Sequence, residues 1–279
     1  MPELPEVETI IRGLSPKLQG LEVSSFKLLF LGVLRNSDQK ILEKLKGKKV
    51  IRLRRRGKWI LIDLDSNLSL VCHFKMTGQF LFCPSERPVD KHTHFILSFK
   101  DRMHELRFRD VRKFGSISCR PTPEVLKFPN LGPEPLRVSF SRFRKLFLSR
   151  RGRLKNLLLN QSFIAGIGNI YADEILFEAK LHPLTPVSML GEGEFSRLWQ
   201  AMRFILRKAI EFRGTSIRNF RDAEDQEGGF KNHLRVYGKE SLSCPRCGKE
   251  IERLRLGGRS SFFCPRCQEE KNKAVESER

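Results

Sequence analysis

The chain has 279 residues, of which 39% are hydrophobic. It is long enough to bury a substantial core, and it contains no apolar run near the roughly 18 residues of a membrane span. Its formal net charge of +21 favours a polyanion such as nucleic acid, since basic side chains displace counterions from phosphates. A generally basic surface or a ribosome-associated protein is the alternative that charge alone leaves open. The acidic amino terminus argues against a signal or transit peptide, so we expect a cytoplasmic protein.

The amino-terminal segment, MPELPEVETI, places proline and carboxylates ahead of an amphipathic pattern. Apolar residues recur at spacings of three and four: Leu4, Val7, Ile11 and Leu14. This spacing predicts a helix from about residue 4 to residue 14, with Pro5 suited to its first turn and acids complementing its dipole. The helix explains Pro5 but not Pro2, and it leaves Glu3 with no more than a capping role.

Residues from about 20 to 120 contain many short runs of β-branched and aromatic residues separated by turn residues. Alternating runs of this kind predict an all-β sandwich or barrel. Three scattered cysteines, Cys72, Cys83 and Cys119, lie in these runs and are typical of reduced core thiols. The segment RPTPEVLKFPNLGPEPL contains five prolines and indicates a domain boundary near residue 135.

Beyond residue 135 the apolar period becomes helical. The segments that carry it are FSRFRKLFLS, RLKNLLLNQ, NIYADEILFEA and a run through Leu198, Met202, Ile205, Ala209 and Phe212 that ends before Gly214. The polar segment DAEDQEGGFKN predicts a mobile loop, and the last residues predict a frayed tail. A domain of helices is therefore expected to follow the domain of strands.

Four further cysteines form two Cys-x-x-Cys pairs, separated by 16 residues: Cys244, Cys247, Cys264 and Cys267. This is the spacing of a zinc ribbon, in which each pair forms one corner and the intervening segment forms a hairpin. Disulfides are the alternative. Four thiolates leave no open coordination position, so we expect one structural Zn²⁺ that holds the hairpin tip, with Arg259 aimed at a phosphate.

Several motifs in chain order resemble the bacterial formamidopyrimidine-DNA glycosylases of the Fpg/Nei family: PELPEVE, RRGKW, HFKMTG, DVRKFG, LGPEPL, AGIGNIYADE and GGRSSFFCPRCQ. The resemblance implies a multidomain α+β protein with DNA in the cleft between its halves. Its expected parts are an N-terminal helix and catalytic β-sandwich at 1–135, a helix-two-turns-helix domain at 136–240, a zinc finger at 241–270 and a tail at 271–279.

The resemblance also gives the opening residues a chemical role. It implies that the initiator methionine is removed and that the Pro2 amine attacks C1′ of a damaged nucleotide. A terminal amine titrates near 8 rather than near 10.4 for lysine, so its neutral fraction at pH 7 is roughly a hundredfold larger. Glu3 resembles the acid–base carboxylate of the family, and Lys58 and Arg259 resemble its two elimination-step cations. Without the resemblance, Lys58 would be interpreted as one more solvated cation.

By motif, the resemblance implies DNA contacts for His92, Arg112, Arg151, Asn169, Met76 and Phe114. Met76, Arg112 and Phe114 resemble a triad that fills the gap left by an everted nucleotide, with Phe114 as the wedge. Composition alone would place Met76 and Phe114 in the core. Asn169 precedes a predicted helix, whose amino terminus is suited to a phosphate.

The sequence departs from the family pattern at a few positions: Lys75, Val111, Lys113, Arg151 and Lys239. The function implied is a bifunctional glycosylase and AP lyase that excises 8-oxoguanine and formamidopyrimidines from double-stranded DNA containing oxidised bases or abasic sites. Two alternatives are an endonuclease VIII-like enzyme for oxidised pyrimidines and a non-catalytic zinc-ribbon nucleic-acid-binding protein. We expect a monomer in the bacterial cytoplasm, associated with the nucleoid through DNA and not with membranes.

Overall fold

The protein is described by a computed structural model that covers residues 1–35, 39–128, 130–148, 150–216 and 226–270. The chain divides into two compact units, Met1–Pro129 with Ala209–Lys231, and Asn130–Lys208 with Asn232–Arg279. The first unit therefore combines the beginning of the chain with a segment from its later part. Within the described ranges, no helix has the length and apolar character needed to span a membrane.

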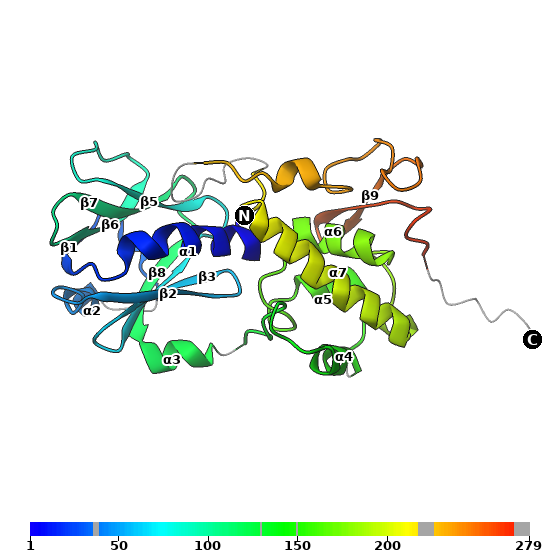
Figure 1. Ribbon diagram of the computed structural model, residues 1–279, viewed down its shortest axis with the longest axis horizontal. Coiled ribbons are helices and arrows are strands. Elements are labelled where there is room, and N and C mark those ends of the chain that lie inside the picture. The colour runs from blue at the N-terminus through cyan, green and yellow to red at the C-terminus, as the bar shows by residue number, and fades with distance from the viewer. Residues whose placement is uncertain (36–38, 129, 149, 217–225, 271–279) are drawn as a thin grey trace, which may run out of the picture. The chain divides into compact units, whose positions relative to one another are not determined.

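The first unit contains two four-stranded antiparallel sheets (Figure 1). One sheet has the order β1 (Val23–Leu28), β6 (Thr93–Phe99), β7 (His104–Asp110) and β5 (Gly78–Pro84). The other has the order β2 (Val50–Arg56), β3 (Trp59–Leu64), β4 (Leu68–His73) and β8 (Ser116–Pro121). Inward residues of both sheets share one apolar core, so the predicted β-sandwich is confirmed.

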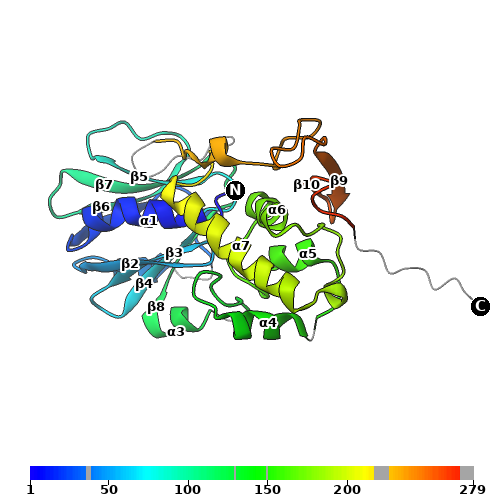
Figure 2. The ribbon, with the colours of Figure 1, turned by 45° about the vertical axis from the view of Figure 1, so that its right-hand side comes forward.

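Helix α1 (Leu4–Leu18) runs between the two sheets in both ribbon views (Figures 1 and 2). Its apolar face joins the same core, where Val7 and Leu14 have no exposed surface. Burial of such side chains contributes roughly 1.5–3 kcal/mol each, which fixes the helix against the sandwich. The helix continues beyond the expected end at residue 14 and accommodates Pro16 in its last turn.

Three short elements were not evident from periodicity: η1 (Leu31–Val33), α2 (Gln39–Glu43) and α3 (Thr122–Lys127). Helix α3 lies inside the proline-rich segment that was expected to be a boundary. It forms there because proline is tolerated in the first helical turn, where its missing N–H has no helical partner to bond. Elements this short carry too few residues to show a 3.6-residue period.

Helices dominate the later part of the chain (Figure 2). They are α4 (Phe140–Leu148), α5 (Leu154–Leu159), α6 (Asn169–Ala179) and α7 (Glu192–Glu211), with the short turns η2 (Val187–Met189) and η3 (Phe230–His233). After α7, the Gly214 N–H bonds to the Ala209 carbonyl at 2.7 Å, and Gly214 has φ +79°. This left-handed residue ends the helical run at the glycine that the sequence indicated.

The expected loop DAEDQEGGFKN lies partly outside the described residues, at 222–225, and the expected tail at 271–279 lies outside them entirely. The described part of the loop is hydrogen bonded. Gly228 N–H donates to Ser216 Oγ at 2.8 Å, and Gly229 pairs with Thr215 in an isolated antiparallel bridge. These bonds fix the described residues on each side of the gap.

The ribbon is a hairpin of β9 (Glu252–Leu256) and β10 (Arg259–Phe263), joined by Gly257 and Gly258. Both glycines have positive φ, 55° and 76°, as a two-residue type I′ turn requires. Residues with a Cβ are strained in that conformation, so the Gly-Gly pair determines where the hairpin turns. Arg259 is the first residue after this turn and is exposed, as predicted for the tip.

Candidate functional site

The amino terminus is held by the carboxylate of Glu6. Glu6 Oε2 accepts the Glu3 N–H at 2.8 Å, and Oε1 accepts the Thr215 N–H at 2.7 Å. Pro2 and Glu3 are buried, whereas Met1 is 47% exposed. Removal of Met1 would leave a secondary amine at the head of α1, next to a buried carboxylate. This placement suits a nucleophile with an adjacent proton donor.

A third acid of the opening segment ties α1 to the turn that carries Lys58. Glu8 Oε2 accepts the Arg55 Nε–H at 3.0 Å, and Arg55 Nη1 also donates to the Gly57 carbonyl at 3.1 Å. Gly57 and Lys58 form the β2–β3 turn, and Lys58 is only 5% exposed. The interpretation of Lys58 as a solvated cation is therefore wrong.

His73 belongs to the same region and was not identified from the sequence. It pairs across strands with Trp59, the residue after Lys58, and their rings meet edge to face at 4.6 Å. Burial, together with the positive charges of Lys75 and Lys58, lowers the pKa of His73 to about 3. Its Nδ1 accepts the Lys75 N–H at 2.9 Å, so the neutral ring carries its proton on Nε2.

We expect His73 to make the protein less stable in mild acid. Its pKa is about 3 in the folded chain and near 6.5 when unfolded, so the unfolded chain binds the proton first as pH falls. The contribution of neutral His73 to the free energy of unfolding is complete above pH 6.5. It declines by about 1.4 kcal/mol per pH unit as the pH falls towards 3. Urea unfolding should show wild type losing about 2 kcal/mol more than His73→Gln between pH 7 and pH 5. An equal loss in both proteins would contradict a neutral His73.

Met76 and Phe114 lie at exposed loop tips, with exposed fractions of 42% and 53%. They were alternatively interpreted as core residues, and that interpretation is wrong. The Arg112 guanidinium lies 4.8 Å from the centre of the Phe114 ring, a cation–π contact that gives the loop tip a flat apolar and cationic surface. Met76 follows β4, and Arg112 and Phe114 follow β7. Both tips are therefore carried by rigid strands.

His92 is half-buried and lies just before β6. Its N–H donates to Asp90 Oδ1 at 2.6 Å, a bond that lowers the pKa of Asp90, and its carbonyl accepts the Asp110 N–H at 2.9 Å. Behind this loop, the buried Arg107 guanidinium donates to the carbonyls of Ser85, Arg87 and Pro88. The backbone that presents His92 is thus fixed from two sides.

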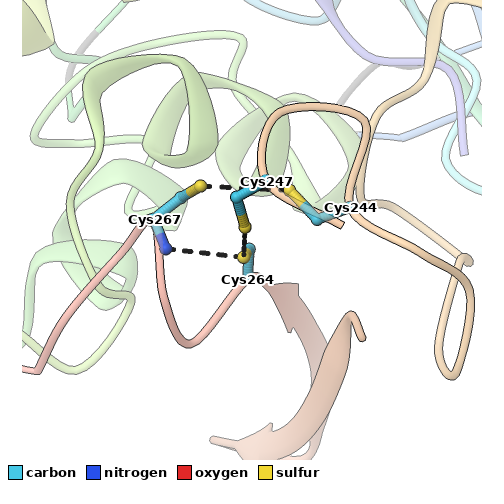
Figure 3. A group of neighbouring side chains, drawn as sticks. All are labelled: Cys244, Cys247, Cys264 and Cys267. Atoms are coloured by element: carbon cyan, nitrogen blue, oxygen red, sulfur yellow. Dashed lines mark hydrogen bonds between the residues drawn. The ribbon is translucent and has the colours of Figure 1, made fainter. Parts of the chain in front are cut away.

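Within the second unit, the four ribbon cysteines converge from two separate loops (Figure 3). All four Sγ atoms lie within 4.8 Å of one another, with Cys244 and Cys267 3.9 Å apart and Cys247 and Cys264 3.4 Å apart. Tetrahedral zinc with Zn–S bonds of about 2.3 Å places sulfurs about 3.8 Å apart. The cluster suits one structural zinc. The disulfide alternative is wrong, because all four cysteines are free.

We expect Cys244→Ala or Cys264→Ala to remove the metal and to abolish DNA binding. Structural zinc supplies much of the folding free energy of so small an element, and each variant leaves three ligands. Metal analysis of purified protein should give one zinc per wild-type chain and less zinc in each variant. DNA binding is measured in parallel by fluorescence anisotropy. Cys83→Ala is the matched control because Cys83 is a buried free thiol outside the ribbon. Tight DNA binding by zinc-free wild type would contradict this role.

Strand β10 is fastened by a buried ion pair between α5 and α6. Lys155 Nζ lies 2.7 Å from Asp173 Oδ1, and both side chains are at most 1% exposed. Lys155 Nζ also donates to the Ser260 carbonyl at 3.1 Å and to Ser261 Oγ at 2.6 Å. Asp173 Oδ2 accepts the Phe262 N–H at 3.1 Å. Burial raises the pKa of Asp173 to about 7 even though Lys155 opposes the rise.

Asn169 and Arg259 meet at the same strand. Asn169 is the first residue of α6, and its Nδ2 donates to the Ser260 carbonyl at 2.9 Å. Ser260 directly follows Arg259, so Asn169 is bonded to the residue next to the other candidate phosphate ligand. Arg151 is exposed ahead of α5, where it borders a hollow of about 470 Å³ with Arg150 and Ser188. The ribbon is also docked on α6, since Arg246 stacks 4.3 Å over the Phe177 ring.

The structure combines a β-sandwich, a set of helices and a four-thiolate ribbon. Basic and apolar side chains lie at the loop tips of the sandwich and at the tip of the ribbon hairpin. Together these features define a zinc-ribbon nucleic-acid-processing protein. Family comparisons narrow this class. Residues 1–117 match the formamidopyrimidine-DNA glycosylase N-terminal domain, residues 131–221 the H2TH domain, and residues 242–269 the zinc finger found in FPG and IleRS. The chain belongs to the formamidopyrimidine-DNA glycosylase family.

Relatives match over nearly the whole chain. The formamidopyrimidine-DNA glycosylase of Desulforamulus reducens is 44% identical over 261 residues, covering 91% of this chain and 94% of the relative. That of Carboxydothermus hydrogenoformans is 44% identical over 256 residues, with the same coverage. A Lactococcus lactis FPG variant complexed with Fapy-dG DNA has a TM-score of 0.91 and 34% identity, covering 96% of this chain and all of that one. The predicted family and fold class are confirmed.

Proposed function

We propose that this chain excises oxidised purines, chiefly 8-oxoguanine and formamidopyrimidines, from duplex DNA and then cleaves the strand. The observation that carries the proposal is the head of α1, where Pro2 adjoins the buried Glu3 and the Glu3 N–H is held by Glu6. Family membership makes the chain a DNA glycosylase with lyase activity, and DNA is its partner. Lactococcus lactis Fpg has been solved with Fapy-dG and with abasic DNA, which supports the substrate class.

In the proposed reaction, the Pro2 nitrogen forms a bond to the sugar C1′ and the bond from C1′ to the base breaks. The departing base or the sugar ring oxygen needs a proton, which the neighbouring Glu3 is placed to supply. The C1′–O4′ bond then breaks and O4′ takes up a proton, which opens the sugar ring and leaves the secondary amine as an iminium ion that keeps its positive charge. This ion withdraws electrons while a proton leaves C2′ and the 3′ phosphate departs, and a second elimination releases the 5′ phosphate.

The remaining candidates have supporting roles in this proposal. Lys58 and Arg259 are cations for the elimination steps, while His92, Arg151 and Asn169 hold the phosphate backbone. Met76, Arg112 and Phe114 occupy the space that the everted nucleotide leaves. We further propose that the enzyme acts as a monomer in the bacterial cytoplasm, associated with the nucleoid through DNA. The domain limits at 135, 240 and 270 remain predictions.

A panel of duplexes, each with one defined lesion, tests the substrate class. Single-turnover excision should be fastest for 8-oxoguanine and formamidopyrimidine lesions, with cleavage of preformed abasic sites. An oxidised pyrimidine belongs in the panel, because Lactococcus lactis Fpg has also been solved with DNA that contains one. Faster excision of pyrimidine than purine lesions would favour the endonuclease VIII-like alternative, and binding without any cleavage would favour the non-catalytic one.

A further inference from the structure

The two exposed tips of the sandwich lie on different connections. Met76 is in the β4–β5 turn, and Arg112 and Phe114 are in the β7–β8 connection, more than thirty residues further along the chain. If each tip moved independently, the surface they present to DNA would have to assemble on every encounter, at a cost in conformational entropy. The structure contains a direct link between them.

The link is the carboxylate of Asp110, the last residue of β7, which has no exposed surface. Oδ1 accepts the Thr77 hydroxyl and, at 3.1 Å, the Arg112 N–H. Oδ2 accepts the Gly115 N–H at 2.7 Å. Thr77 Oγ1 also accepts the Arg112 N–H, at 3.2 Å, so the two connections share a single hydrogen-bond network.

The backbone of Asp110 extends the network to a third element. Its N–H donates to the His92 carbonyl at 2.9 Å, and its carbonyl is bonded to His94 Nε2 at 2.7 Å. Gly115 has to be glycine for this packing, because a Cβ there would lie 2.6 Å from Phe108 Cζ and 3.1 Å from Asp110 Oδ2. Asp110 therefore bonds the backbone of His92, Arg112 and Gly115 as well as the hydroxyl of Thr77.

We propose that Asp110 is a positioning residue that holds Met76, Arg112 and Phe114 as one preformed wedge. The inference rests on the proposed function, in which these three side chains replace an everted nucleotide. Asp110 touches neither base nor sugar; it acts through Thr77 and the backbone of residues 112 to 115. Misplacement of an oriented group by about 1 Å can cost on the order of a hundredfold in rate, so loosening this network should impair base eversion.

Asp110→Asn tests the proposal, because an amide of the same shape replaces one acceptor oxygen by an N–H₂ group that faces an N–H donor. Thr77→Val removes the hydroxyl link, and Thr77→Ser keeps it. Asp63→Asn is the matched control. Asp63 is also a buried carboxylate, 4% exposed, but it bonds Arg52, Arg54 and Ser69 in the opposite sheet.

Two readouts separate positioning from general stability. The first is the ratio of single-turnover excision of 8-oxoguanine to cleavage at a preformed abasic site, which needs no intact base to be everted. We expect this ratio to fall about tenfold or more in Asp110→Asn and Thr77→Val, to recover in Thr77→Ser, and to stay unchanged in Asp63→Asn. The second is hydrogen exchange of residues 74–78 and 111–116. Both segments should exchange faster in Thr77→Val, although Thr77 belongs to only one of them.

The outcomes are distinct. An unchanged ratio in Thr77→Val, or an equal fall in Asp63→Asn, would overturn the positioning role, as would faster exchange confined to residues 74–78. Thr77→Val carries the test if Asp110→Asn does not fold, as judged by its urea midpoint. If wild type cleaves neither lesion nor abasic duplexes, the proposed function fails. Hydrogen exchange then still decides whether the two connections are coupled, and uncoupled exchange would overturn the inference on its own.

Discussion

Borohydride will lock the enzyme to lesion-containing DNA only when Met1 has been removed, and the adduct will map to Pro2. The amine of Pro2 can attack C1′ only when no peptide bond engages it. The iminium that forms is the species that hydride reduces, so trapping reports the covalent step directly. A chain with an uncleaved amino-terminal extension should lose trapping by at least a hundredfold. Intact mass measurement of each preparation establishes whether Met1 is present.

Two variants refine this prediction. Pro2→Gly replaces the secondary amine with a primary one and should give weak trapping. Glu3→Gln should slow base removal about a hundredfold or more while leaving some cleavage of preformed abasic sites, because an amide cannot supply the proton needed for the first step. Strong trapping by a verified, extended chain would transfer the nucleophile to a lysine such as Lys58. Pro2 would then be only a structural residue that precedes α1.

The second large effect concerns the buried ion pair behind Arg259. At pH 8, above the raised pKa of Asp173, Asp173→Asn leaves the Lys155 ammonium without a counter-charge in a buried site, and such a change typically costs about 3–5 kcal/mol. It also weakens the attachment of β10, because Asp173 accepts the Phe262 N–H and Lys155 holds Ser260 and Ser261. We expect a lower urea midpoint and slower release of the 5′ phosphate, the step assigned to Arg259.

The double variant Lys155→Met with Asp173→Asn provides the control. It removes both charges and so avoids the unpaired ammonium, and its stability should recover relative to Asp173→Asn alone. Glu178→Gln is a second control, since Glu178 is a half-buried carboxylate on the same helix that pairs with Arg235 and Arg246. If Glu178→Gln lowered the urea midpoint and slowed release of the 5′ phosphate as much as Asp173→Asn does, β10 would depend on α6 as a whole. The buried ion pair would then have no specific role.

The sequence predicted the sandwich, the main helices and the ribbon because each has a strong local pattern. Alternating strands, a 3.6-residue period and paired cysteines are visible within a few residues. The opening segment was predicted as a helix for the same reason. Helix α3 was not, because its six residues lie among prolines and show no period.

The site was predictable where a motif carries its chemistry and not where the chemistry depends on distant partners. Composition alone would have placed Met76 and Phe114 in the core, and their exposure follows from the connections on which they lie. Lys155 resembles any helical lysine in sequence, and its burial depends on Asp173 and on a strand about a hundred residues later. Asp110 stands in a motif, but its partner Thr77 is set by sheet pairing between β5 and β7.

The hydrogen bond from Thr215 to Glu6 joins residues that are 209 positions apart in the chain. During synthesis, the amino-terminal residues leave the ribosome long before their partner has been made. The head of α1 therefore cannot make all of its final hydrogen bonds until almost four-fifths of the protein exists. Until then we expect the first peptide bond, once it lies outside the ribosome, to be accessible to a methionine-removing enzyme. The late closure of the fold thus leaves time for Met1 to be removed before Pro2 is enclosed.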